Sequence, residues 1–202
     1  HIFLIVGESY SQQYFDPAFA DLHVADRGKA FMDDPHTAWI RTALSAGIIS
    51  RPSIVSLMLG IFDAGLELNE REQFWQGTLP TSMPVQLRKL GYQTNYWYGG
   101  SMAHGNFNHF APACGFNHSY SGTDICGPKA PRSWVGVYDH VFLNKVADMI
   151  QQRSDDVPQF HFVYTTSNHG PYKMPLKDLG FNAKTIMNVQ PDVLKEKIIS
   201  KA

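Results

Sequence analysis

Three things are scarce in this 202-residue sequence: cysteine, an excess of charge of either sign, and long hydrophobic runs. Lys and Arg together number 17 and Asp and Glu 18, which gives a formal net charge of −1. This balance offers no electrostatic attraction for nucleic acid or an acidic membrane surface, so we expect neither to be the main partner. The longest apolar run, Ile2 to Val6, is far too short to cross a bilayer. We therefore expect any membrane contact to come from segments outside this chain.

The only two cysteines are Cys114 and Cys126, separated by a stretch rich in Gly, Ser and Asn. They form neither a CxxC motif nor a Cys/His spacing typical of structural zinc, so we expect no such zinc site. The sequence leaves open whether they form a disulfide that closes a loop or remain free thiols. A disulfide would favour an extracytoplasmic compartment.

Apolar residues, by contrast, are abundant and fall into an alternating pattern. Hydrophobic residues make up 44% of the chain and aromatic residues 13%, which is enough for a sizeable core. Short apolar runs that end in Gly, Ser or Asn predict buried strands at Ile2 to Val6, Thr94 to Tyr98 and Phe160 to Thr165. Helices are predicted between them, one after Ser82 and one from about Asp139 to Arg153. This alternation predicts an α/β fold, with a mostly parallel central sheet flanked by helices and ligands at the carboxyl ends of the strands.

The two predicted helices carry specific signals. Ser82 is a typical N-cap, Gly91 is a stop signal, and Met83, Leu87 and Leu90 fall on one face. The apolar stripe of the later helix consists of Phe142, Val146, Met149 and Ile150.

Other stretches have less regular patterns. Residues Gly99 to Ser133 are rich in Gly, Asn, His, Pro and Ser, so we expect a long irregular excursion with a functional role. The pattern predicts a loop from Lys173 to Pro191 and a helix from Asp192 to Lys201.

Two residues that follow or begin predicted elements are candidates for chemistry. Glu8 follows the first apolar run, where its carboxylate could bind a metal or cap a helix. Ser50, two residues before Pro52, is a natural N-cap. A helix start also stabilises a developing phosphate charge, so Ser50 can combine capping with nucleophilic attack if a base or metal removes its proton. A GxSxG nucleophile elbow is absent, which disfavours an ordinary serine hydrolase.

Further candidates would contact the substrate. Asn168 and His169 precede Gly170 on a predicted turn after the last strand, where an imidazole can contact a phosphoryl oxygen or donate a proton to a leaving alkoxide. Trp134 lies at a loop-to-helix junction and could offer an aromatic platform to a glycerol-like or sugar-like substrate. His104 is the strongest candidate among the histidines of the irregular stretch, although no ligand spacing supports it.

Taken together, these segments resemble the sulfatase-like branch of the alkaline phosphatase superfamily, and within it the phosphoglycerol transferases and lipoteichoic acid synthases. The resemblance spans nearly the whole chain. It is carried by Gly7-Glu8-Ser9, by Ser50-Arg51-Pro52-Ser53 with Ser56-Leu57 and Gly60, by Tyr98-Gly99-Gly100, by Trp134 to Asp139, and by Ser167 to Tyr172.

The resemblance implies roles for individual residues. Glu8 would be a metal ligand, Ser50 the nucleophile and a second metal ligand, and His169 a contact for the substrate phosphate. The nucleophile of the transferase branch is commonly threonine, and sulfatases have an arginine where Ile54 stands here. The family completes its metal site with an Asp-His pair in an Asp-His-Gly setting, and this sequence has no Asp-His-Gly. Asp139-His140 matches a helix start instead, so we expect the remaining ligands beyond Ala202.

The preferred hypothesis from the sequence is a metal-dependent transferase. It would move a phosphoglycerol-type headgroup from a phospholipid to a glycan or polymer hydroxyl through a phosphoseryl intermediate, using one manganese or zinc ion. Residues 1–202 would be the N-terminal part of one catalytic domain on the extracytoplasmic face of a bacterial membrane. A phosphoethanolamine transferase and a sulfatase or phosphodiesterase are alternatives, and a non-catalytic domain that binds glycans or headgroups is an alternative of another class.

Overall fold

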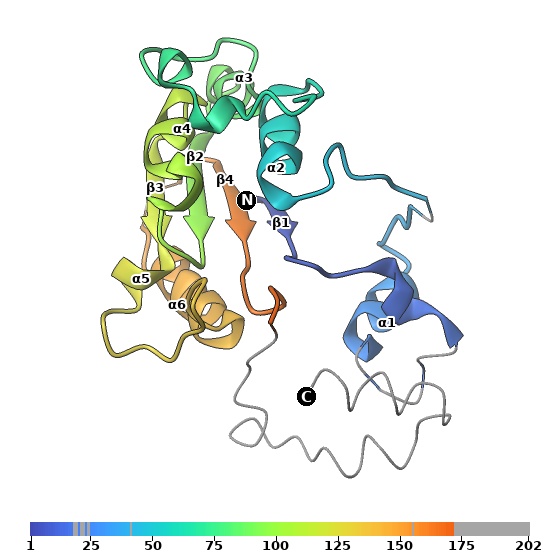
Figure 1. The fold of residues 1–202 in the computed structure, drawn as a ribbon. Helices are drawn as coiled ribbons and strands as arrows, with labels where there is room; N and C mark the ends of the chain where they lie inside the picture. The colour runs from blue at the N-terminus through green and yellow to red at the C-terminus, as the bar shows by residue number, and fades with distance from the viewer. Residues whose placement is uncertain (18–19, 21–22, 24, 41, 155, 172–202) are drawn as a thin grey trace. The chain divides into compact units, whose positions relative to one another are not determined.

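The structure, a computed structural model, describes residues 1–17, 20, 23, 25–40, 42–154 and 156–171. It contains a four-stranded sheet with the strand order β1-β4-β2-β3 (Figure 1). All pairings in this sheet are parallel, which confirms the predicted parallel sheet flanked by helices. The strands are Ile2–Val6 for β1, Gln93–Tyr98 for β2, His118–Ser121 for β3 and Gln159–Tyr164 for β4.

The register of the sheet brings three strand ends together. Tyr164 at the end of β4 pairs with Val6 of β1 on one side and with Tyr98 of β2 on the other. The ladder continues one residue further, because the Thr165 N–H donates to the Val6 carbonyl at 3.1 Å and the Gly99 N–H donates to the Tyr164 carbonyl at 2.9 Å. Residues that follow β1, β2 and β4 therefore start from the same edge of the sheet.

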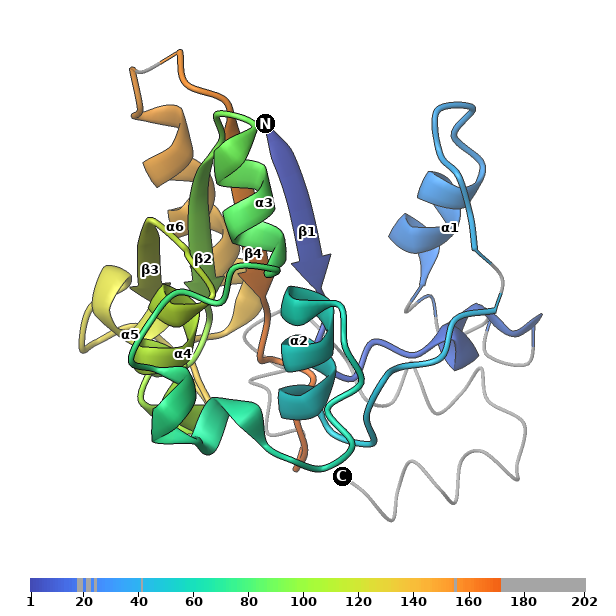
Figure 2. The same ribbon diagram turned by 90° about the horizontal axis from the view of Figure 1, so that it is seen from above.

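One face of the sheet is covered by α2 (Ser50–Leu59), α3 (Met83–Lys89) and α4 (Phe107–Ala113), as Figures 1 and 2 show. Burying one large apolar side chain stabilises a fold by about 1.5–3 kcal/mol, so this layer is a main source of stability. Its largest fully buried side chains include Tyr96, Tyr98, Phe107, Phe110, Phe160 and Phe162.

The opposite face is covered by α6 (Asp139–Gln151), which packs against Trp97 and Val163. This confirms the predicted helix to within two residues at its carboxyl end. All four members of its predicted apolar stripe lie in this second cluster: Phe142, Val146, Met149 and Ile150.

The signals predicted for α3 are mostly confirmed. The Ser82 hydroxyl accepts a hydrogen bond from the Val85 N–H at 3.4 Å, and Met83 and Leu87 pack against the core. Leu90 does not share this face, because it is the C-cap residue and is 73% exposed.

The prediction of an irregular stretch from Gly99 to Ser133 is wrong in most of its length. This stretch contains the 3-10 helix η5 (His104–Asn106), α4, β3 and α5 (Gly122–Ile125). Its Gly, Asn and Pro residues suggest loops, but burial of aromatic side chains of α4 in the core outweighs these local preferences. Cys114 and Cys126 are both free thiols, the first of them buried.

The described residues between 10 and 43 belong to a second compact unit. In its described part, η1 (Gln12–Phe15) is capped by Ser11 and α1 is Asp26–Met32. The predicted loop from Lys173 to Pro191 and helix from Asp192 to Lys201 lie outside the described residues. Within the described part of the chain, no helix is both long and apolar enough to span a membrane.

Candidate active site

Glu8 lies two residues beyond the end of β1, and its side chain is turned inward. The residue is only 7% exposed. Its backbone N–H donates to the Thr165 hydroxyl at 3.1 Å, which ties it to the residue after β4. A carboxylate so far removed from water needs hydrogen-bond donors or a cation, because an unpaired buried charge is costly.

Three hydroxyl groups supply these donors. The Ser50 hydroxyl donates to Glu8 Oε2 at 2.7 Å, and the Tyr164 hydroxyl donates to the same oxygen at 2.6 Å. The Ser9 hydroxyl donates to Oε1 at 2.8 Å. The structure therefore brings Glu8 and Ser50, 42 positions apart in the chain, into direct contact.

Ser50 is the first residue of α2 and not its N-cap, which corrects the sequence-based prediction by one position. The N-cap is Ile49, which has extended backbone angles and offers no side-chain cap to the helix. The reason is the competing bond to Glu8, which turns the Ser50 hydroxyl away from the backbone N–H groups of its own helix.

Opposing influences set the pKa of the Glu8 carboxyl. Burial alone would raise this pKa, but the hydrogen bonds from Tyr164, Ser50 and Ser9 and the electrostatic influence of His169 together lower it. Glu8 is therefore ionised at neutral pH and presents a full negative charge beside the Ser50 hydroxyl.

Tyr164 is a site residue that sequence reasoning missed. Its ring stacks on that of Tyr98, with centroids 4.9 Å apart and planes 7° apart. Burial and the hydrogen bond to Glu8 raise the pKa of Tyr164, so its hydroxyl remains a donor. The sequence signal for it is that the strand β4 ends in Tyr164, a polar aromatic residue, at the sheet edge where the sequence also predicts Glu8.

Asp139, at the start of α6, organises the loop after β4. Its Oδ1 accepts hydrogen bonds from the backbone N–H groups of Thr166 at 2.9 Å and Ser167 at 3.1 Å. This confirms that Asp139 belongs to a helix start. Its carboxylate holds the first residues of the loop that leads to Asn168 and His169.

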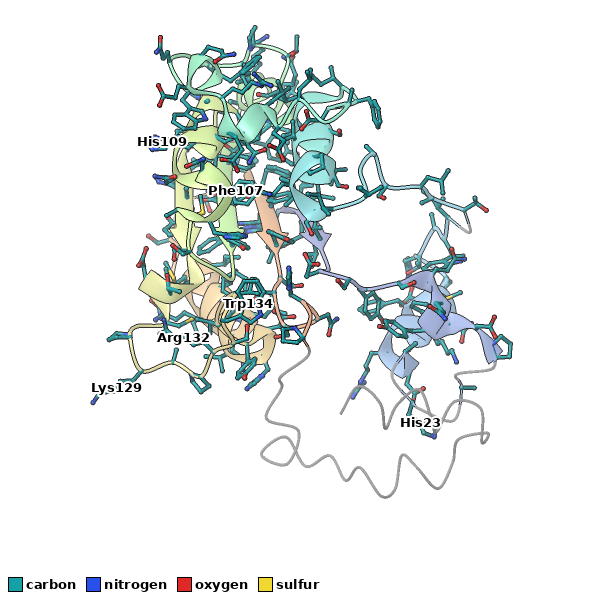
Figure 3. The ribbon with its side chains drawn as sticks, in the orientation of Figure 1. His23, Phe107, His109, Lys129, Arg132 and Trp134 are labelled. Atoms are coloured by element: carbon teal, nitrogen blue, oxygen red, sulfur yellow. The ribbon has the colours of Figure 1, made fainter. Side chains whose placement is uncertain are left out.

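Trp134, which is labelled in Figure 3, lies at this loop. Its ring contacts that of His169. The two rings are edge to face with centroids 5.1 Å apart, and the Trp134 indole N–H donates to the Gly170 carbonyl at 3.2 Å. His169 Nδ1 lies 2.8 Å from that carbonyl and must therefore be its proton-bearing nitrogen. A neutral His169 presents Nε2 as an acceptor, and only the protonated ring presents a second donor.

The remaining candidates are Asn168 and His104. Asn168 is half-buried in the turn before His169. His104 is exposed at the start of η5, and no hydrogen bond found among the described residues joins it to Glu8 or Ser50. The following residue, Gly105, lies against the side chain of Arg51.

The donor set fits part of a site for a divalent cation. The Glu8 carboxylate and the Ser50 hydroxyl are adjacent oxygen donors of the type that hard cations and zinc accept. Within the described ranges, no group of three or more His, Cys, Asp or Glu residues is arranged to hold a metal. These residues could therefore supply two ligands, and a complete site would need others.

Known proteins share both the sequence pattern and the fold. A family model described as sulfatase matches residues 30–184. A crystal structure of an alkaline phosphatase superfamily protein from Vibrio parahaemolyticus has a TM-score of 0.66 and 22% identity, over 86% of this chain and 42% of that one. The lipoteichoic acid synthase LtaP from Listeria monocytogenes has a TM-score of 0.60 and 20% identity, over 78% of this chain and 36% of that one. The chain thus spans less than half the length of either solved structure.

Proposed function

The chain belongs to the sulfatase family, a family of enzymes, and from this premise we propose that it carries the nucleophile half of a metal-dependent active site that acts on phosphoesters. The observation that supports the proposal most is the 2.7 Å hydrogen bond between the hydroxyl of Ser50 and the buried carboxylate of Glu8. A structural cap would point its hydroxyl at the helix backbone. Ser50 instead points it at a charged group.

The residues of the chain would prepare Ser50 for attack in two ways. Glu8 fixes the direction of the O–H bond, so that the lone pairs of Oγ are turned away from the carboxylate. The first turn of α2 lacks a side-chain cap at Ile49, so its N–H groups can stabilise negative charge on a phosphoryl oxygen. A manganese or zinc ion held by Glu8 and Ser50 would lower the pKa of the hydroxyl and offset the charge of the phosphoryl group.

His169 and Trp134 would define the substrate side. A protonated His169 can donate from Nε2 to a phosphoryl oxygen or to the leaving alkoxide, since Nδ1 is occupied by the Gly170 carbonyl. Trp134 is 66% exposed, and its ring can cover the apolar edge of a glycerol or sugar unit. Asn168 and His104 would add polar contacts at the rim.

The specific reaction we propose is transfer of a phosphoglycerol-type headgroup. The Ser50 hydroxyl loses its proton as its oxygen forms a bond to phosphorus, the phosphorus–oxygen bond to diacylglycerol breaks, and the leaving oxygen takes up a proton. A hydroxyl of a glycan or growing polymer then loses its proton, bonds to phosphorus and displaces the Ser50 oxygen, which is protonated again. Its support is the fold shared with the lipoteichoic acid synthase LtaP and Ile54 at the position where sulfatases have arginine.

This reaction fixes the setting that we propose for the whole protein. Residues 1–202 would form the N-terminal part of one catalytic domain, located on the extracytoplasmic side of a bacterial membrane that supplies the lipid donor. The second candidate, which the family match favours, is hydrolysis of sulfate esters.

The decisive experiment compares Ser50→Ala with Ser50→Thr in the full-length protein. Release of diacylglycerol from a fluorescent phosphatidylglycerol and hydrolysis of p-nitrophenyl sulfate are measured in parallel. Ser50→Ala should lower headgroup release by at least about 1000-fold, as loss of a nucleophile does, whereas Ser50→Thr keeps the hydroxyl and a measurable rate. Ser53→Ala, one turn along α2, is the matched control.

Each result has a clear meaning. Headgroup release that survives Ser50→Ala refutes the assignment of the nucleophile. Sulfate hydrolysis without headgroup release favours the sulfatase candidate, and mass spectrometry of the Ser50 peptide then distinguishes formylglycine from a phosphoseryl adduct. If neither activity is detected and the protein binds lipid headgroups or glycans specifically, a non-catalytic domain is favoured.

A further inference from the structure

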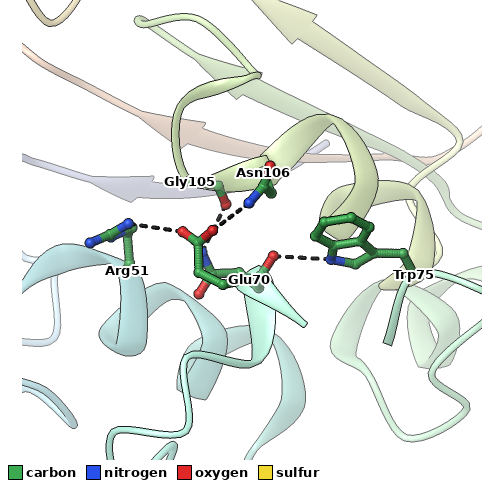
Figure 4. Close-up of polar contacts among 6 residues, drawn as sticks. Arg51, Glu70, Trp75, Gly105 and Asn106 are labelled. Carbon is green, nitrogen blue, oxygen red and sulfur yellow. Dashed lines mark hydrogen bonds and ion pairs between the residues drawn. The ribbon is translucent and has the colours of Figure 1, made fainter. Parts of the chain in front are cut away.

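Glu70, the last residue of η3 (Leu68–Glu70), binds side chains from two other segments (Figure 4). Arg51 Nη1 donates to its Oε1 at 2.8 Å, and the Asn106 side-chain amide donates to its Oε2. The neighbouring Asn69 amide donates to Oε1 at 3.2 Å. Every oxygen of the Glu70 carboxylate therefore has a donor, and these donors come from α2, η3 and η5.

Backbone carbonyl groups near the Glu70 carboxylate accept further hydrogen bonds that join the same segments. The Asn69 amide also donates to the Gly105 carbonyl at 2.8 Å, and the Trp75 indole N–H donates to the Asn69 carbonyl at 3.0 Å. Gly105 has a φ of +68°, and a Cβ added to it would lie 3.0 Å from Cδ of Arg51. The turn of η5 can pack this closely on Arg51 because residue 105 has no side chain.

The position of Arg51 gives this cluster a connection to the candidate site. Arg51 follows Ser50 in the first turn of α2, a turn that lacks a side-chain N-cap. Asn106 and Gly105 follow His104 in η5, which lies beyond the carboxyl end of β2. Glu70 thus joins the helix start that carries the candidate nucleophile to the turn that carries a candidate substrate contact.

The solvent exposure of the Arg51–Glu70 ion pair argues against a role in protein stability alone. The side chains of Arg51 and Glu70 are 37% and 29% exposed, so water screens their attraction. Partly exposed ion pairs contribute little to stability. The contacts of Glu70 are, however, directional and come from three segments, which suits the fixing of geometry.

We propose that Glu70 is a positioning residue that sets the orientation of Ser50 through Arg51. Glu8 constrains the hydroxyl of Ser50 directly, and Glu70 constrains the backbone turn from which that hydroxyl projects. This inference rests on the proposed function, since it assigns Glu70 a part in the same reaction. Glu70 itself does not contact the substrate.

The test uses the full-length protein and the variants Glu70→Gln, Arg51→Lys and their combination. Glu72→Gln is the matched control, because Glu72 is exposed and only two residues away. Values of kcat and KM are measured with bis(p-nitrophenyl) phosphate and Mn²⁺, together with the thermal midpoint. Hydrogen exchange by mass spectrometry follows peptides that cover residues 48–55 and 101–107.

A positioning role predicts a specific pattern. Glu70→Gln lowers kcat by about 10- to 100-fold, as small misplacements of reacting groups do, and leaves KM within about twofold. Arg51→Lys has a similar effect, and the combined variant is no worse than either single variant because both act through one contact. Both peptides exchange faster in Glu70→Gln and not in Glu72→Gln.

The outcomes separate this inference from the proposed function. If Ser50→Ala abolishes activity but Glu70→Gln keeps the kcat of the control, only the positioning role is refuted. If the wild-type protein neither cleaves the phosphodiester nor releases the lipid headgroup, the proposed function is refuted, and hydrogen exchange alone decides whether Glu70 joins the two segments. Losses of kcat that multiply in the combined variant also overturn the inference. If Glu70→Gln does not fold, Arg51→Lys compared with Glu72→Gln gives the same decision.

Discussion

Removing one hydroxyl group from each of two tyrosines should destabilise the protein at one position and not at the other. Tyr164 and Tyr96 lie on neighbouring strands and belong to the same core cluster. The Tyr164 hydroxyl donates to the Glu8 carboxylate at 2.6 Å. The Tyr96 hydroxyl is buried, and the described residues give it no hydrogen-bond partner. Replacing either residue with Phe is therefore the same chemical change in two different electrostatic settings.

The expected magnitudes follow from these partners. A hydrogen bond to a charged group contributes about 1.5–3 kcal/mol, so Tyr164→Phe should lower the free energy of unfolding by about 2 kcal/mol near neutral pH. Tyr96→Phe removes a buried donor that is not satisfied, and it should be neutral or stabilising by up to about 1 kcal/mol.

The effect of Tyr164→Phe should depend on pH. The folded-state pKa of Glu8 is lowered, so its carboxylate contributes stability that is present above the unfolded pKa and is lost as the pH falls through the folded pKa. Losing the donor from Tyr164 reduces this contribution only while Glu8 is ionised. The difference between wild type and Tyr164→Phe should therefore shrink as the pH is lowered below the ordinary pKa of a glutamate carboxyl and through the lowered pKa of Glu8.

Urea denaturation at pH 7 and at acidic pH measures both effects, with the slope m checked for constancy. Tyr96→Phe serves as the matched control for loss of a hydroxyl from the aromatic layer. The reasoning is refuted if the two variants have equal stability at pH 7. It is also refuted if the deficit of Tyr164→Phe is unchanged in acid.

Three further predictions concern other parts of the chain. Phe142→Ala should lower the free energy of unfolding by about 3–5 kcal/mol in urea denaturation, because Phe142 lies on the buried side of α6 and is 0% exposed, so its loss leaves a cavity. Trp134→Ala should leave the unfolding midpoint nearly unchanged, since the side chain is 66% exposed, but raise KM for a glycerol-containing phosphodiester. A thiol reagent should label Cys126 in the native protein and reach Cys114 only after unfolding, because Cys126 is only partly buried whereas Cys114 is fully buried.

Part of the fold could be predicted because its determinants are local. Apolar runs that end at small polar residues gave β1, β2 and β4 within two residues, and the 3.6-residue stripe of α6 was correct in all four members. The parallel order then required that Glu8 and the loop after β4 share one edge of the sheet. Ser50 was brought to that edge by its position at the start of α2, which the Pro52 signal indicated.

Other features could not be predicted because their causes are tertiary. The composition of α4 suggests a loop, and the helix depends on packing of Phe107 and Phe110 against the sheet. Tyr164 was not predicted as a site residue because an aromatic residue in a buried strand usually belongs to the hydrophobic core. Glu70 was not predicted either, because it lies in the charged stretch Asn69-Glu70-Arg71-Glu72, whose pattern is typical of a solvated surface.

The kind of groups that surround the Glu8 carboxylate favours a cation site. An acidic side chain that is 7% exposed can be stabilised by a basic partner, which cancels its charge, or by neutral donors, which do not. The donors to the Glu8 carboxylate are the hydroxyls of Ser9, Ser50 and Tyr164. These hydroxyls lower the pKa of Glu8 and leave its negative charge intact at the sheet edge. Such a shell keeps the carboxylate ionised and attractive to a divalent cation, whereas a purely structural role would be met equally well by an apolar side chain at lower cost.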